Sequence, residues 1–177
     1  MDRSDCTIVR FDAVRREAEV VHVRPATRED RAALPALHTA AVEAFGPDGY
    51  DVDGVRRWAG AGERSPDDYD VDAPAEHFTV AVREGAVVGF GHVVLDAGEV
   101  HAVYVHPDHA GHGVGSALLA ELEGYARGQG CGALSLQSSL NAVGFYERAG
   151  YERVGEDESP GGLPVVEMRK ELVSDGA

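Results

Sequence analysis

The most constraining stretch of this 177-residue chain is HPDHAGHGVGSALL, residues 106–119. An apolar pattern of helical period begins within it, at Val114. Glycine in an ordered segment costs about 0.5–1 kcal/mol relative to alanine, because it loses more backbone freedom. Glycines so close to a helix start indicate that something approaches this backbone closely. The alternating residues are, in order, Gly111, His112, Gly113, Val114 and Gly115.

Hydrophobic periodicity around this stretch predicts a mixed α/β sheet of the α+β kind. Three β-branched runs precede the glycines and are separated by short turns, one of them Glu84-Gly85, which is typical of antiparallel hairpins. The order expected is a strand near 19–27, helices at 27–46 and 51–60, a loop at 62–75, three strands within 77–105, a helix at 114–128, a strand at 133–137, a helix at 141–150, and strands at 151–158 and 164–172.

The first helix carries conflicting signals about where it begins. Thr27 and Asp30 have the spacing of a capping box, and Gly46 is a stop signal. Pro35 lies inside the pattern and predicts a kink or a late start. Residues 1–18 are expected to be a loose arm or an extra strand, and residues 19–174 a single domain.

A glycine-rich turn at a helix N-terminus favours a pyrophosphate, because free N–H groups and the helix dipole attract anions. The P-loop motif is excluded because no lysine follows the glycines. The dinucleotide fingerprint fits poorly, because the spacing is G-x-G-x-G and the next strand, ALSLQSS, ends without an acid. A nicotinamide-dependent oxidoreductase is therefore disfavoured.

A third motif fits: the meander, then YVHPDHAGHGVGSALL, a strand, and NAVGFYERAGY resemble the GNAT superfamily of acyl-CoA-dependent N-acetyltransferases. The resemblance covers about residues 20–171. It implies a mostly antiparallel sheet with splayed middle strands and flanking helices. The family's loop is usually Q/R-x-x-G-x-G/A, and here Ala110 stands at its first position and His112 at its second basic position.

The resemblance also implies site residues and a co-substrate, acetyl-CoA. The strand from Val103 through Tyr104 to Val105 would pair with the pantetheine arm, and its N–H groups would face the thioester carbonyl. Asn141 would lie near the pantetheine and Tyr146 near the sulfur, as the acid that protonates the leaving thiolate. The pyrophosphate would be held by the loop residues Gly111, His112, Gly113, Val114, Gly115 and Ser116.

The base that takes the proton of the amine is left open between two residues. Glu99 and His101 share one face of the strand leading to the site unless a β-bulge intervenes. The loop histidines His106, His109 and His112 lack a fourth ligand, so no metal site is expected. Trp58, with Tyr50 and Tyr69, is a candidate for an acceptor pocket, although core packing is favoured for Trp58.

Charge sets further limits on partners. The net charge of −15 argues against nucleic acid and against anionic membrane surfaces. Lys170 is the only lysine, and so acidic a chain resembles proteins of salt-loving organisms. There is no long apolar run, the first residues lack a signal-peptide pattern, and the two cysteines make no framework, so a cytoplasmic protein is expected.

The resemblance thus implies an enzyme that moves an acetyl group from acetyl-CoA to a primary amine by direct attack in a ternary complex. The acceptor is either a small molecule or a protein or peptide amine. Homodimers are common in the family that the chain resembles, but the sequence does not determine the oligomeric state. The alternative is a catalytically silent module that binds or senses acyl-CoA on the same fold.

Overall fold

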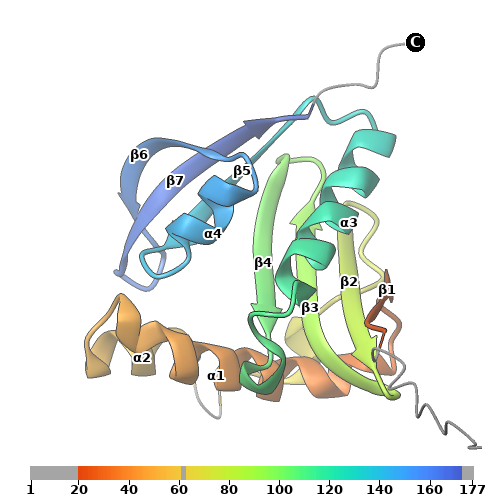
Figure 1. The fold of residues 1–177 in the computed structure, drawn as a ribbon, viewed down its shortest axis with the longest axis horizontal. Helices are drawn as coiled ribbons and strands as arrows, with labels where there is room; N and C mark the ends of the chain where they lie inside the picture. The colour runs from red at the N-terminus through yellow and green to blue at the C-terminus, as the bar shows by residue number, and fades with distance from the viewer. Residues whose placement is uncertain (1–19, 61–62, 173–177) are drawn as a thin grey trace, which may run out of the picture.

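The computed structural model describes residues 20–60 and 63–172, and seven strands of this part form one sheet in the order β1-β2-β3-β4-β5-β7-β6 (Figure 1). Neighbouring strands are antiparallel except β4 and β5, which are parallel. The predicted fold class is confirmed, whereas the expected arm at 1–18 lies outside the described residues. The strands are His22–Pro25 (β1), Glu76–Arg83 (β2), Ala86–Val94 (β3), Glu99–Val105 (β4), Ala133–Ser139 (β5), Glu152–Glu158 (β6) and Pro164–Glu171 (β7).

Helices cover both faces of the sheet. Along β3, Phe90 packs with Leu34 of α1, whereas Val93 packs with Leu119 and Leu122 of α3. Because side chains of a strand alternate between faces, α1 and α3 lie on opposite sides. The α-helices of the described residues are Leu34–Phe45 (α1), Val52–Ala59 (α2), Val114–Gly128 (α3) and Val143–Arg148 (α4). In this part of the chain, no helix combines the length and apolar character needed to span a bilayer.

The first helix starts late, as one of the two alternatives for Pro35 predicted. A 3₁₀ turn precedes α1, and Pro35 occupies the first helical turn, where its missing N–H needs no partner. The expected capping box is only half formed. Asp30 accepts the Thr27 backbone N–H at 2.7 Å, but the Thr27 hydroxyl donates to the same carboxylate at 2.9 Å instead of capping the helix. The Arg24 guanidinium also binds this carboxylate and lowers the pKa of Asp30 to about 2.

The hairpin and the second helix agree with the sequence. Glu84 and Gly85 both have positive φ, 50° and 80°, as a tight type I′ turn between β2 and β3 requires. The Asp51 carboxylate caps α2 by accepting the Gly54 N–H at 2.7 Å, and Gly60 ends the helix in the left-handed conformation.

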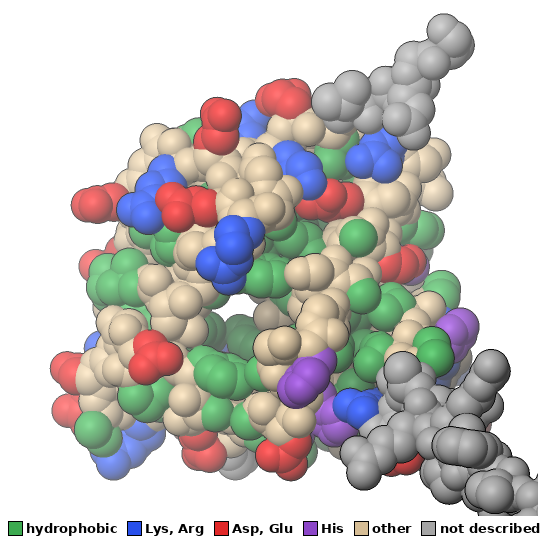
Figure 2. All heavy atoms as spheres, in the orientation of Figure 1, with side chains coloured by type: hydrophobic (Ala, Val, Ile, Leu, Met, Phe, Trp, Pro, Cys, Tyr) green, Lys and Arg blue, Asp and Glu red, His purple; other side chains and the backbone are tan. Residues whose placement is uncertain are grey.

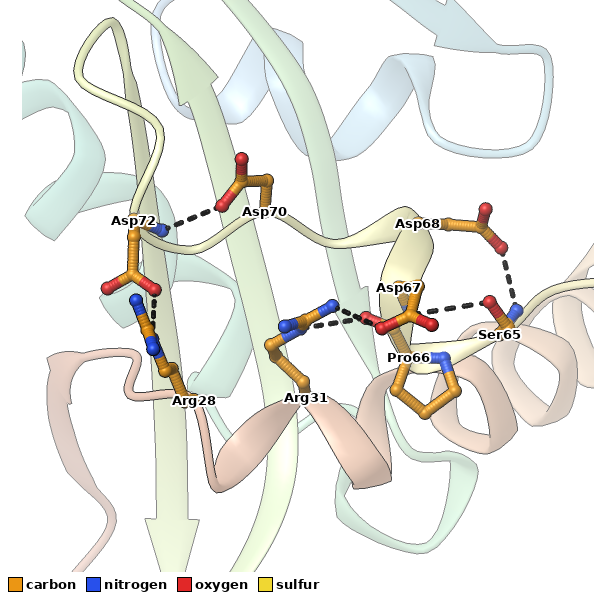
Figure 3. A network of polar contacts seen from close by, with 8 residues as sticks. All are labelled: Arg28, Arg31, Ser65, Pro66, Asp67, Asp68, Asp70 and Asp72. Carbon is orange, nitrogen blue, oxygen red and sulfur yellow. Dashed lines mark hydrogen bonds and ion pairs between the residues drawn. The ribbon is translucent and has the colours of Figure 1, made fainter.

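The loop after α2 is tied to the start of α1 by arginine side chains (Figure 3). Arg31 binds the Asp67 carboxylate at 2.9 Å and the Pro66 carbonyl at 2.8 Å, and Arg28 pairs with Asp72. Residues 63–75 of the expected loop therefore run beside the N-terminal end of α1, and a short 3₁₀ turn at Pro66–Asp68 interrupts them.

The sheet opens between β4 and β5, and this opening positions the site. The two strands pair only at Glu99 with Ser135 and at Val100 with Leu136. Beyond Val100, no described residue pairs with the edge of β4 that faces β5. The predicted splay of the middle strands is confirmed, and the sheet forms a V at this point (Figure 1).

Candidate functional site

The splay leaves a cavity of about 610 Å³. It lies between β4, the glycine stretch (residues 110–116), α4 and the helices α1 and α2. Figure 2 shows the surface hollowed through near the middle of this face. Most of the predicted site residues line the cavity, but Glu99 and His112 are not in its wall. Those that line it are His101, Val103, Tyr104, Val105, Gly111, Gly113, Val114, Gly115, Ser116, Asn141 and Tyr146.

The glycine stretch, residues 110–116, is shaped by two left-handed residues. Gly111 has φ 76° and Gly113 has φ 81°, a conformation that other L-residues adopt only under strain. A Cβ at either position would have no atom within 4 Å, so the space above the loop is open. No side chain caps α3 at Gly113, and the first N–H groups of the helix therefore remain available to an anion.

The free edge of β4 is a second element of the site. Val103, Tyr104 and Val105 pair with β3 on one side and have no described strand partner on the other. Their remaining backbone N–H and C=O groups are thus free to bind an extended ligand, as an added strand would.

Two tyrosines contribute buried hydroxyls to the cavity. Tyr146 on α4 is 8% exposed, and burial raises the pKa of its hydroxyl far above its ordinary value, with a smaller contribution from Tyr104. Burial also raises the pKa of Tyr104 to about 12, although the Trp58 indole donates to its oxygen at 3.1 Å. Both hydroxyls therefore keep their protons at neutral pH and can donate hydrogen bonds.

The β-bulge that the sequence allowed in β4 is present. Val93 faces Val100 and His92 faces Ala102, so His101 is the extra residue of the strand. The Glu99 carboxylate nevertheless stays with it, because Glu99 Oε2 lies 3.1 Å from His101 Nε2. Of the two candidate bases, only His101 lines the cavity.

The wall opposite the loop includes residues that the sequence did not single out as site residues. Phe45 of α1, Asp48 and Arg148 line the cavity, and so do Gln137 and Ser139 of β5. No local motif marks these positions, and only the packing of α1 beside β4 brings the first two to the site.

The aromatic residues proposed for an acceptor pocket lie in different parts of the structure. Trp58 lines the cavity, so the core packing favoured for it is wrong, and its ring stands 5.6 Å from that of Tyr50. Tyr69 is 6% exposed and packs in the core with Phe78 and Phe90, away from the site.

Of the loop histidines, His106 and His109 lie edge to face, with ring centroids 6.0 Å apart. The His106 imidazole accepts the Asp108 N–H at 3.2 Å, and His109 Nδ1 lies 3.4 Å from a guanidinium nitrogen of Arg83. Within residues 20–60 and 63–172, no three His, Cys, Asp or Glu side chains are grouped as metal ligands.

Comparisons with known proteins agree with this geometry. A family profile described as an acetyltransferase (GNAT) domain matches residues 50–172. IAA acetyltransferase of Azospirillum brasilense is 34% identical over 85 residues, which cover 44% of this chain and 56% of that protein. N-alpha-acetyltransferase RimI of Mycobacterium tuberculosis is 33% identical over 90 residues, 47% of this chain and 56% of that protein. The chain thus spans little more than half the length of these relatives.

Solved structures share the whole fold. A GCN5-related N-acetyltransferase from Rhodopseudomonas palustris has a TM-score of 0.78 at 27% identity, covering 86% of this chain and 96% of that one. PaiA N-acetyltransferase of Thermoplasma acidophilum, in complex with coenzyme A, has a TM-score of 0.69 at 19% identity, covering 86% and 99%. The profile match spans well over half of the sequence and coincides with the splayed sheet and the glycine stretch, and the chain therefore belongs to the GNAT family of acetyltransferases.

Proposed function

We propose that this protein transfers the acetyl group of acetyl-CoA to a primary amine, by direct attack while both substrates are bound. The observation that carries the proposal is the single cavity in which the glycine stretch, the free edge of β4, His101 and Tyr146 meet. In this cavity, elements that would bind the co-substrate lie beside groups that could transfer protons. Such an arrangement suits a reaction in which both substrates are bound at once.

The residues present suit the co-substrate. Backbone N–H groups of the glycine stretch, from Gly111 to Ser116, would hold the pyrophosphate. The free edge of β4 would pair with the pantetheine amides. Asn141 adds support, because its buried Oδ1 has no hydrogen-bond partner among the described residues and could accept a pantetheine N–H. Two of the structural neighbours contain coenzyme A, and a third contains AcCoA.

The proton transfers can be assigned to three side chains. His101, with Nε2–H donated to Glu99, carries a lone pair on Nδ1 and takes the proton of the ammonium. The amine nitrogen then forms a bond to the carbonyl carbon, while N–H groups of β4 stabilise the oxyanion. The C–S bond breaks, Tyr146 donates its proton to the departing thiolate, and the second proton lost by the attacking nitrogen restores the Tyr146 hydroxyl. The products are an N-acetyl amine, a free thiol and the proton held by His101.

The alternative, a silent acyl-CoA-binding module, makes a different prediction in one experiment. Calorimetry measures acetyl-CoA binding, and thiol release is followed over an amine panel at low and high salt. Acetyl-CoA binding together with amine-dependent thiol release is the result we expect. Binding without release for any amine would favour the module, and the absence of binding would contradict both functions.

A further inference from the structure

The cavity has an aromatic wall on the side away from the glycine stretch. It is formed by Phe45 of α1, Trp58 of α2 and Tyr104 of β4, all half-buried. Among the described residues, the hydrophobic core clusters include neither Phe45 nor Trp58. The exposed surface of these two rings therefore faces the cavity and is not packed into the core.

The wall is held in place by polar and ring contacts. The Trp58 indole N–H donates to the Tyr104 hydroxyl at 3.1 Å, and the two ring centroids are 6.4 Å apart. The His38 ring lies edge-on to Tyr104, with centroids 4.5 Å apart. Because the indole is anchored through its only donor, its apolar surface is left to contact a ligand.

The acidic side chain of the cavity wall is Asp48, whereas the Arg64 guanidinium lies behind the wall, where its charge acts on Tyr104 and His38. Asp48 lines the cavity just after α1, and its carboxylate makes no hydrogen bond or ion pair with any described residue. The cationic side chain in the cavity wall is Arg148, which lies along α4 with Nη1 3.4 Å from the position of a Cβ on Gly144. In the proposed function, α4 is the helix beside the cofactor, so the positive charge lies on the cofactor side.

We propose that the acceptor is a primary amine carried by an aromatic body that bears no anionic group. This inference rests on the proposed function and names the substrate class of the same site. The ammonium ion is attracted by Asp48, and the ring packs among Phe45, Trp58 and Tyr104. A carboxylate on the acceptor is repelled by Asp48, and a polyhydroxylated amine finds few hydrogen-bond partners on an aromatic wall.

Four amines separate these features: 2-phenylethylamine, L-phenylalanine, ethylamine and glucosamine. The first two differ only by a carboxylate, and the third lacks the ring. We expect kcat/KM for 2-phenylethylamine to exceed that of each other amine by about tenfold or more, the range that one pocket contact gives in substrate discrimination.

Binding is measured independently of turnover. Trp58 is the only tryptophan of the chain, so intrinsic fluorescence reports directly on this wall. With coenzyme A present and no acetyl group to transfer, 2-phenylethylamine is expected to change the Trp58 emission at lower concentrations than L-phenylalanine does.

The variants are Asp48→Asn and Trp58→Phe, with Asp53→Asn as the control. Asp53 on α2 is 82% exposed, does not line the cavity, and its replacement changes the net charge equally. Asp48→Asn should bring the ratio between the two phenyl amines close to one in both assays, whereas Asp53→Asn should keep it. Trp58→Phe keeps an aromatic ring and should keep the preference for 2-phenylethylamine over ethylamine.

The outcomes distinguish this inference from the proposed function. If amines are acetylated but L-phenylalanine or glucosamine is preferred, the inference is overturned, and a carboxylate preference would point to Arg148. If no amine is acetylated, the proposed function fails, and the fluorescence titration still decides the class of ligand. Equal emission changes for all four amines would overturn the inference in that case too.

Discussion

The Tyr50 hydroxyl oxygen accepts a hydrogen bond from the backbone N–H of Leu140 at 3.1 Å. The same hydroxyl donates to the Pro164 carbonyl at 2.8 Å, at the start of β7. One side chain before α2 thus joins the turn ahead of α4 to the C-terminal hairpin. This contact joins segments about ninety residues apart in the chain, next to Ser139 and Asn141 of the cavity wall.

Tyr50→Phe removes both hydrogen bonds and leaves the ring. Each bond contributes about 0.5–1.5 kcal/mol, so we expect the free energy of unfolding to fall by about 1–3 kcal/mol. The KM for the amine should rise, because α2 carries Trp58. Denaturant unfolding and steady-state kinetics measure the two effects. Tyr125→Phe is the matched control, since the Tyr125 hydroxyl has no hydrogen bond within the described part of the chain. Equal losses of unfolding free energy in both variants would show that the two hydrogen bonds of Tyr50 do not stabilise the fold.

Gly113→Val should weaken acetyl-CoA binding by about tenfold or more, which corresponds to about 1.4 kcal/mol. Valine disfavours φ 81°, and its branched side chain would project into the open space above the loop. Calorimetry measures the affinity, and circular dichroism checks the fold. Gly124→Val is the control, because Gly124 lies on the exposed side of α3 with ordinary φ and open space around it. A folded Gly113→Val protein with the parental affinity would contradict the assignment of the loop.

Much of the fold could be predicted from the sequence because periodicity and turn residues are local signals. Glu84-Gly85 and the glycines at 111 and 113 have the left-handed backbone that these positions demand. The choice between Glu99 and His101 could not be made, because a bulge depends on how β4 meets β3. Trp58 and Tyr69 were also indistinguishable, since which aromatic ring faces a cavity is decided by tertiary packing.

Stability should fall as the pH is lowered from about 6.5 to about 4, because His38 is buried. Burial lowers the pKa of His38 to about 4, with help from the Arg64 charge. An unfolded histidine binds a proton near pH 6.5, so the unfolded state holds more protons across this interval and is favoured as pH falls. Below about pH 4 both states are protonated, and this contribution no longer changes.

The measurement is the thermal midpoint at several pH values for the parent and His38→Gln. The variant should depend less on pH between 6.5 and 4, although it is less stable at neutral pH. His22→Gln, at an exposed residue of β1, is the control and should keep the parental slope. An unchanged slope in His38→Gln would mean that His38 titrates normally in the folded protein.

Stability should rise with salt, as the net charge of −15 predicts. The Debye length shortens from about 10 Å at 0.1 M to about 3 Å at 1 M, so repulsion among the acidic side chains weakens. The arginine–aspartate pairs of Figure 3 are exposed and their loss costs little in comparison. The thermal midpoint in potassium chloride tests this. A flat or falling midpoint up to molar salt would reject the halophilic interpretation and leave the proposed acetyl transfer untouched.

Tyr146→Phe should lower kcat by about tenfold or more and leave acetyl-CoA affinity nearly unchanged. The hydroxyl is buried, belongs to a residue of the cavity wall and is uncharged at neutral pH, so it can donate to a thiolate that forms late in the reaction. An interaction made only with the leaving group acts on the transition state and therefore appears in kcat. The ring contacts with Phe145 and Tyr151, at 5.0 and 5.7 Å between centroids, remain in phenylalanine and preserve the packing.

Tyr151→Phe is the control, because Tyr151 is buried in the same cluster but does not line the cavity. Single-turnover measurements establish that chemistry limits the rate. If Tyr146→Phe then turns over at the parental rate, Tyr146 is a packing residue, and the hydroxyl of Tyr104 becomes the donor to examine.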